Sequence, residues 1–269
     1  MINELVATYK YRHVIYYFVY TSIKVRYKRS FLGYLWTVLA PMAYYLVLGL
    51  IFSYGLKAGM PGRNYYVYFI SGAIIFSAIS SIINQSCNIM MANEGYIKKI
   101  YVPKLVFILN VVFYELTNFI LIFISVLLLG FITKQINFSY HCFFSIVPIV
   151  FLIFFASGAA MIMSVASVYF RDLIHITPVV LNAFFFGTPI MWYKEMAPPI
   201  MSKLNMLNPF YYFVELFRTP FLNNEFPDIK IMAITMFFSF IIFLVGLLLL
   251  NKLNNRIIFK LWKMNVLLK

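Results

Sequence analysis

The sequence predicts an all-α integral membrane protein with six membrane-spanning helices, and three observations support this fold class. Of the 269 residues, 63% are hydrophobic and only 11% are charged, whereas a soluble domain keeps about a quarter of its residues charged. The apolar residues fall in blocks of about 20, the length that a helix needs to cross a hydrocarbon core of about 30 Å. These blocks lack the apolar–polar alternation of a transmembrane β-barrel strand. We therefore expect the chain to cross the membrane as helices.

The six predicted spans lie between residues 35 and 250, after a leader of residues 1–34 and before a basic tail of residues 251–269. A cleaved signal peptide is the alternative interpretation of the first block, but the apolar region of a signal peptide covers only about 7–15 residues. The first block is longer and lies behind a basic leader, so an uncleaved span is the better prediction. The predicted spans are Leu35–Leu56, Tyr65–Ile83, Leu105–Ile132, Phe143–Val168, Ile174–Met191 and Ile231–Leu250.

The distribution of lysine and arginine predicts the orientation of the chain. With the N-terminus in the cytoplasm, 15 of the 22 basic residues fall in cytoplasmic segments and 7 in outer segments. Because cytoplasmic segments carry the excess of lysine and arginine, both termini are expected in the cytoplasm. The formal net charge of +14 is thus explained by orientation and by contact with membrane lipids, and it does not indicate binding of nucleic acid.

The leader is rich in both aromatic and basic residues over 7–32. This composition favours an amphipathic helix in the membrane interface, with its basic side chains toward anionic headgroups. The alternative is a basic segment that only sets the orientation. The basic side chains at its end are Lys24, Arg26, Lys28 and Arg29.

The inner loop between the second and third spans predicts a short helix over 93–104. Asn93 can cap this helix, and Glu94 is favourable in its first turn. Ile97, Ile100 and Tyr101 would share one face, and Pro103 would separate the helix from the next span. Such a helix parallel to the membrane could receive a cytoplasmic partner, whereas the alternative is a plain connecting loop.

The outer segment from 192 to 230 is too long for a simple connection. It contains an apolar, aromatic stretch from Asn208 to Phe221 that is too short to cross the membrane. We expect one or two short re-entrant or interfacial helices here. Glu215 and Arg218 are three residues apart and could form an ion pair on such a helix.

Glu115 is the carboxylate predicted at membrane depth, where an ionisable residue is a functional candidate. It would be the main argument for an ion-coupled secondary transporter, although Asn110, Thr117 and Asn118 nearby favour a structural hydrogen-bonded role equally. No metal site is predicted, because two cysteines and three scattered histidines do not form a ligand set. A membrane-embedded transferase is the other alternative, but its acid/base residues would have to come from the outer Glu195, Glu215, Glu225 and Asp228, which no histidine of the same loop accompanies. Cys87 and Cys142 are expected at opposite membrane faces, which excludes a disulfide between them.

Several segments, taken in order, resemble the polysaccharide-exporting permeases of the type-2 ABC transporter family. The leader and first span contribute Lys24–Trp36 and Pro41, and the inner loop contributes Gly95–Pro103. The turn after the fourth span contributes Tyr169–Leu173, and the outer-loop signatures of the family are matched by Thr188–Ile190 and Leu207–Pro209. The resemblance covers nearly the whole chain in the right order and spacing.

This resemblance implies a homodimeric permease in the bacterial cytoplasmic membrane, assembled with two ATP-binding subunits, which moves a lipid-linked glycan outward. O-antigen is the expected glycan, with capsular polysaccharide or teichoic acid as alternatives. ATP and Mg²⁺ would be used by the partner, and this chain would bind no cofactor. Independently, the sequence contains no Gly-x-x-x-x-Gly-Lys-Ser/Thr phosphate loop.

The resemblance also implies roles for four groups of residues. Contact with the ATPase is expected from Asn93, Glu94, Gly95, Tyr96, Ile97, Lys98, Lys99 and Tyr101. A gate helix at the entrance would carry Lys24, Arg26, Tyr27, Lys28 and Arg29. The candidate channel lining is Tyr44, Tyr45, Phe184, Phe185 and Phe186. The outer exit would be shaped by Asn208, Phe210, Tyr211, Tyr212, Glu215 and Arg218.

Overall fold

The computed structural model describes residues 2–26, 32–51, 64–132, 140–222 and 224–267, and all regular elements in these ranges are helices. Four helical segments of the described chain are long and apolar enough to cross a membrane. They are α4 (Tyr65–Ala92), α6 (Lys104–Ile132), α7 (Ile146–Tyr169) together with the preceding 3-10 helix η3 (Tyr140–Ser145), and the Ile229–Asn254 part of α11 (Ile229–Leu267). The chain is therefore an all-helical, multi-pass membrane protein.

Two further apolar helices, α3 (Trp36–Leu50) and α8 (Leu173–Gly187), have 15 residues each. At 1.5 Å per residue each is about 22 Å long, less than the usual thickness of the hydrocarbon core. The first predicted span continues beyond α3 into residues 52–56, which lie outside the described residues. The predicted end of the fifth span at Met191 is wrong. Thr188 is extended and ends α8, because a residue before proline is disfavoured in the helical conformation.

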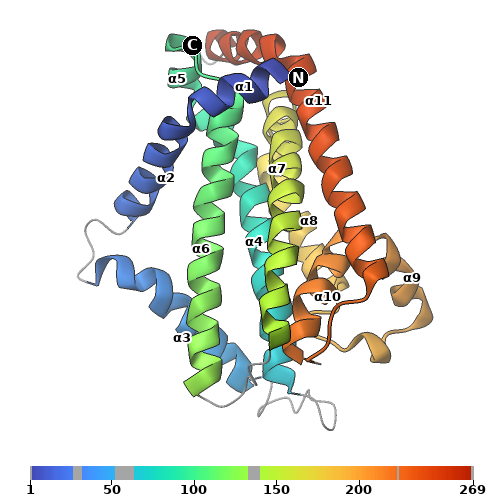
Figure 1. Cartoon of the computed structure of the whole chain (residues 1–269). Helices are drawn as coiled ribbons and strands as arrows, with labels where there is room; N and C mark the ends of the chain where they lie inside the picture. Colours follow the sequence, from blue (N-terminus) through green and yellow to red (C-terminus); the bar gives the residue numbers. More distant parts are fainter. Residues whose placement is uncertain (1, 27–31, 52–63, 133–139, 223, 268–269) are drawn as a thin grey trace.

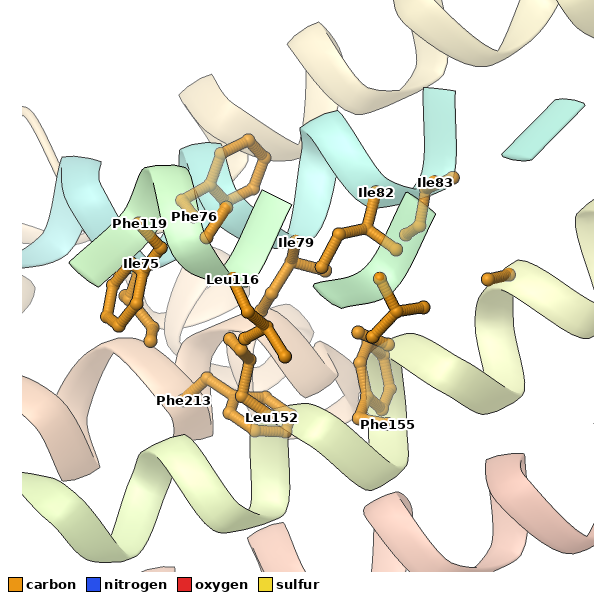
Figure 2. Close-up of a cluster of buried hydrophobic side chains, with 14 of the residues drawn as sticks. Ile75, Phe76, Ile79, Ile82, Ile83, Leu116, Phe119, Leu152, Phe155 and Phe213 are labelled. Carbon is orange, nitrogen blue, oxygen red and sulfur yellow. The ribbon is translucent and has the colours of Figure 1, made fainter. Parts of the chain in front are cut away.

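The core of the bundle is centred on α4, which packs against α6, α7, α8 and α10 (Pro209–Leu222). Figure 2 shows isoleucine and phenylalanine side chains of α4 between those of α6, α7 and α10. Because α4 is enclosed by other helices, its side chains are buried along most of its length, including Ile75, Ile79 and Ile82.

The helices α7 and α11 approach each other closely at two glycines. A Cβ atom on Gly158 would overlap the backbone of Ile242, and one on Gly246 would lie 2.5 Å from the Gly158 carbonyl oxygen. Small residues at such positions let two membrane helices bring their backbones together. The small residues Ala156, Ala160 and Ser164, one turn apart along α7, are also completely buried.

The two ends of the bundle carry different elements (Figure 1). At one end, α1 (Ile2–Lys10), α5 (Glu94–Lys99) and the C-terminal part of α11 lie close together, and α2 (Arg12–Arg26) leads away from them along α6. The half away from α5 holds α9 (Pro199–Leu207) and α10, which follow the 3-10 helix η4 (Lys194–Met196). One or two short helices were expected in the 192–230 segment, and its described residues form two α-helices, α9 and α10. The 3-10 helix η1 (Gly33–Leu35) precedes α3.

Candidate functional site

Arg218 on α10 is the centre of a buried polar cluster at the end of the bundle away from α5. Only 2% of its surface is exposed. Its Nη2 donates to the Pro189 carbonyl oxygen over 2.8 Å, and its Nη1 donates to Glu215 Oε1 over 3.3 Å. The guanidinium lies over the ring of Tyr68, with 3.6 Å between Cζ and the ring centroid. These contacts offset the cost of removing the charge from water.

Glu215 connects Arg218 to the turn before α9. Its Oε1 accepts from Arg218, while its Oε2 lies 2.6 Å from Lys194 Nζ. The predicted ion pair between Glu215 and Arg218 is therefore confirmed. The contact with Lys194 could not be inferred from spacing, because the two residues are 21 positions apart.

Two tyrosines of α4 hold the same turn through its backbone. The Tyr68 hydroxyl is within hydrogen-bond distance of the carbonyl oxygens of Pro189 and Trp192, at 3.1 and 2.9 Å. The Tyr65 hydroxyl donates to the Met191 carbonyl oxygen over 2.7 Å. We call Tyr65, Tyr68, Lys194, Glu215 and Arg218 the Arg218 cluster. It joins α4, α10 and the 188–196 turn.

Asn208 connects the start of α10 to the end of α8. Its Oδ1 accepts from the Phe210 amide over 3.0 Å and so caps the start of α10. Its Nδ2 donates to Thr188 Oγ1 over 2.8 Å, and that hydroxyl in turn donates to the Phe184 carbonyl oxygen at the end of α8. The segment Thr188–Ile190 and the segment Leu207–Pro209 are therefore directly bonded to each other.

The structure places the residues expected at an outer exit mostly inside the chain. Asn208, Phe210, Tyr212, Glu215 and Arg218 are buried, and Tyr211 is partly buried. Phe210 packs against Phe76, Phe155 and Phe184. These side chains contact other parts of the same chain, and their roles at an exit remain a prediction.

At the opposite end, α5 is shorter than the predicted helix over 93–104. It ends at Lys99 because Ile100 is extended. Ile97 is buried, but Ile100 and Tyr101 are exposed, Tyr101 by 90%. The expectation that these three residues share one helix face is therefore wrong. Exposed with them are Gly95, Tyr96 and Lys99, while Asn93, Glu94 and Lys98 are partly exposed.

Asn93 joins α4 to α5 in a different way from the one predicted. Its side chain makes no cap on α5 but donates from Nδ2 to the Ile89 carbonyl oxygen over 2.9 Å, at the end of α4. Its own carbonyl oxygen accepts from the amides of Tyr96 and Ile97, both at 3.0 Å. Within α5, Glu94 and Lys98 form an ion pair one turn apart.

The end of α2 lies against polar residues of α6. Arg26 Nη1 donates to the Tyr114 hydroxyl over 3.0 Å, and Arg26 is also an electrostatic neighbour of Glu115. Glu115 accepts hydrogen bonds from Gln85 and, at 3.3 Å, from Asn118. The structure thus gives Glu115 a cationic neighbour that the sequence did not reveal. Lys24 lies 5.8 Å from the Tyr20 ring centroid, while Tyr27, Lys28 and Arg29 are outside the described residues.

The candidate channel residues divide into packed and exposed side chains. Tyr45 is buried, with its hydroxyl 3.5 Å from Ser77 Oγ, and Phe185 packs against Phe76. Tyr44, Phe184 and Phe186 are exposed. Beside Phe184, a hollow of about 500 Å³ lies between α8 and α9, and its lining is mostly apolar. It also includes Asn205 and Asn208.

Comparison with known proteins identifies the family. The profile described as "ABC-2 type transporter" matches residues 13–222, which is more than half of the chain. The chain belongs to the ABC-2 type transporter family. This match begins in α2 and ends with α10, so it includes both ends of the bundle described above.

Curated relatives agree with this family over most of their length. The chain is 31% identical over 241 residues to an O-antigen export system permease protein RfbA of Klebsiella pneumoniae, covering 87% of this chain and 90% of the relative. It is 28% identical to the protein of that name from Myxococcus xanthus, covering 85% of this chain and 87% of the relative. It is also 28% identical to the polysialic acid transport protein KpsM of Escherichia coli, covering 73% and 76%.

Family membership assigns the general role of the chain. The chain is a membrane permease, a non-catalytic transport component. An ABC-2 permease works with a subunit that binds ATP, so ATP and Mg²⁺ are used by that partner. Within the described residues, no group of three or more histidine, cysteine, aspartate or glutamate side chains could hold a metal ion.

Proposed function

We propose that this chain is the permease subunit of an ATP-driven exporter that moves a lipid-linked polysaccharide, O-antigen, across the bacterial cytoplasmic membrane. The observation that carries the proposal is the match over 87% of this chain and 90% of a relative named as an O-antigen export permease. Capsular polysaccharide is the second candidate substrate, because KpsM, a polysialic acid transport protein, matches over 73% of the chain.

In this proposal six helices cross the membrane, with α3 and α8 as the first and fifth spans. The four long apolar helices supply the others. Both termini and α5 face the cytoplasm, since lysine and arginine gather in the segments at that end. The 192–230 segment then lies on the outer side as short re-entrant helices.

The working unit is a homodimer with two ATP-binding subunits. The exposed side chains of α5 and of Ile100 and Tyr101 form the surface for the ATPase, because apolar and aromatic groups exposed next to basic ones are typical of an interaction site. The exposed faces of α3 and α8 suit the translocation path between two protomers, with Tyr44, Phe184 and Phe186 on them. The entrance is formed by the end of α2, at Lys24 and Arg26.

Transport into inverted membrane vesicles tests this function. Vesicles that contain the chain and its ATP-binding subunit should take up lipid-linked glycan only when ATP is added, and ionophores that abolish ion gradients should not reduce the uptake. Uptake that stops with the ionophore and ignores ATP would instead support an ion-coupled transporter, with Glu115 as the residue to substitute. Offering O-antigen and capsular glycans separately distinguishes the two candidate substrates.

A further inference from the structure

We propose that Arg218 is a positioning residue that joins α4 to the 188–196 turn, so that a displacement of α5 reaches the far end of α8. The inference rests on the proposed function, in which α5 receives motion from the ATP-binding subunit. It adds a path from that subunit to the outer end of the fifth span. Arg218 is itself buried and acts through other groups.

The first part of the path is the joint between α5 and α4. Asn93 lies between the two helices and is bonded to both. Its amide and its side chain donate to the Ile89 carbonyl oxygen of α4, and its own carbonyl oxygen accepts from two amides of α5. Further along α5, the side chain of Ile97 is buried against the bundle and provides a second contact. A push on α5 is therefore passed to the end of α4.

The second part is α4 itself. Its 28 residues give a continuous helix of about 42 Å. No proline interrupts it, and neighbouring helices lie around it (Figure 1). Most of its side chains are buried. A helix that is packed in this way moves as a rigid element, which is how coupling is carried between distant sites.

The third part is the Arg218 cluster at the other end of α4. Here Arg218 contacts the Tyr68 ring on α4, Glu215 on its own helix and the Pro189 carbonyl oxygen of the turn. Gly72 of α4 lies beneath the guanidinium, and a Cβ atom there would be 2.5 Å from Arg218 Nη2. The absence of a side chain at Gly72 therefore permits the close approach of Arg218 to α4.

The turn held by Arg218 follows directly after α8. Thr188 ends that helix and Pro189 accepts from Arg218, so the position of the cluster sets the position of the last turn of α8. That turn carries Phe184 and borders the hollow between α8 and α9. Movement of α4 therefore changes the region where the proposed path leaves the membrane.

The test compares Arg218→Lys with the wild-type chain in purified complexes with the ATP-binding subunit. Lysine keeps the charge but lacks the planar fork that binds two acceptors at once. The amount of glycan exported per ATP hydrolysed should fall about tenfold, while assembly and ATP hydrolysis are retained. A nitroxide can be attached at Met196→Cys in a chain that also carries Cys87→Ser and Cys142→Ser. Its spectrum should change on ATP binding when residues 72 and 218 are Gly and Arg, and should not change when Arg218→Lys or Gly72→Ala is added.

Gly72→Ala disturbs the same contact without altering Arg218 and should also lower export per ATP. Because both changes act on one contact, the double variant should be no worse than the more severe single variant. Lys203→Gln, an exposed lysine of α9 in the same segment, is the control and should transport normally.

Export per ATP at the wild-type value in both Arg218→Lys and Gly72→Ala would overturn the inference, as would additive effects in the double variant. If Arg218→Lys does not assemble, the test relies on Gly72→Ala, through its export per ATP and its nitroxide spectrum. A wild-type complex that exports no glycan with ATP would instead contradict the proposed function.

Discussion

The two ends of α4 differ in how deeply the charged and aromatic side chains around them are buried. At the Arg218 cluster, an arginine and a carboxylate are buried and bonded to groups of the same chain. At α5, Tyr96, Ile100 and Tyr101 are exposed and the ion pair between Glu94 and Lys98 remains partly accessible. One end therefore buries its charged and aromatic side chains, whereas the other leaves several of them exposed.

This difference predicts opposite consequences of substitution. Changes at the Arg218 cluster should alter the stability of the isolated chain, because they leave buried groups without partners. Changes at α5 should leave that stability unaltered and weaken only the association with the ATP-binding subunit.

Arg218→Ala should destabilise the isolated chain by about 3–5 kcal/mol, because it removes one partner of a buried ion pair. The temperature of unfolding in detergent measures this effect. Lys203→Ala, in the same segment but exposed, should stay within about 0.5 kcal/mol of the wild type. Equal stability of the two variants would contradict the structural role of Arg218.

A matched pair of tyrosines compares the two ends directly. Tyr193 is buried and packs on Tyr68 with 4.4 Å between ring centroids, so Tyr193→Ala should cost about 3–5 kcal/mol. Tyr101→Ala should cost less than about 0.5 kcal/mol, but it should weaken binding of the ATP-binding subunit. The contrast fails if both variants unfold at the same temperature.

The double variant Lys98→Glu and Lys99→Glu should reduce affinity for the ATP-binding subunit by about tenfold or more, because it reverses the charge of the proposed surface. The unfolding temperature of the isolated chain should change little. The control is Lys203→Glu with Lys230→Glu, which makes the same charge change on exposed lysines of the 192–230 segment. This control variant should bind the ATP-binding subunit normally. Titration of the purified partner against each variant supplies the affinities, and equal losses in both would argue against docking at α5.

Lys194→Ala should have the smallest effect, about 1 kcal/mol or less, because the lysine is 43% exposed and water screens its contact with Glu215. The effect should shrink further at high salt. A loss as large as that of Arg218→Ala would mean that Lys194, and not Arg218, is the main partner of Glu215.

Local patterns predicted the helical class, the four long apolar helices and the ion pair between Glu215 and Arg218, because each depends on periodicity or composition over a short stretch. The end of α8 was misplaced because the apolar block continues through Met191, while the pre-proline position Thr188 stops the helix. The prediction that Ile97, Ile100 and Tyr101 share one helix face was wrong for a similar reason, since the short α5 ends before Ile100.

Apart from Glu215 and Asn118, which lie three residues away, the partners of Arg218 and Glu115 could not be predicted, because they come from distant parts of the chain. Pro189, Tyr68 and Lys194 meet Arg218 or Glu215 only when α4 and α10 are packed together. Arg26 approaches Glu115 from the leader. Pro189 and Arg26 gave a signal, since both lie in segments that carry the resemblance, but their contacts could not be read from it.

Co-purification of the chain with an ATP-binding subunit shows whether the chain is the permease of an ATP-driven exporter. A C-terminally tagged chain solubilised in mild detergent should retain the subunit in a one-to-one ratio, and the complex should hydrolyse ATP. Lys98→Glu with Lys99→Glu should lose the subunit, while Lys203→Glu with Lys230→Glu should keep it. A wild-type chain that purifies alone and without ATPase activity would contradict the account.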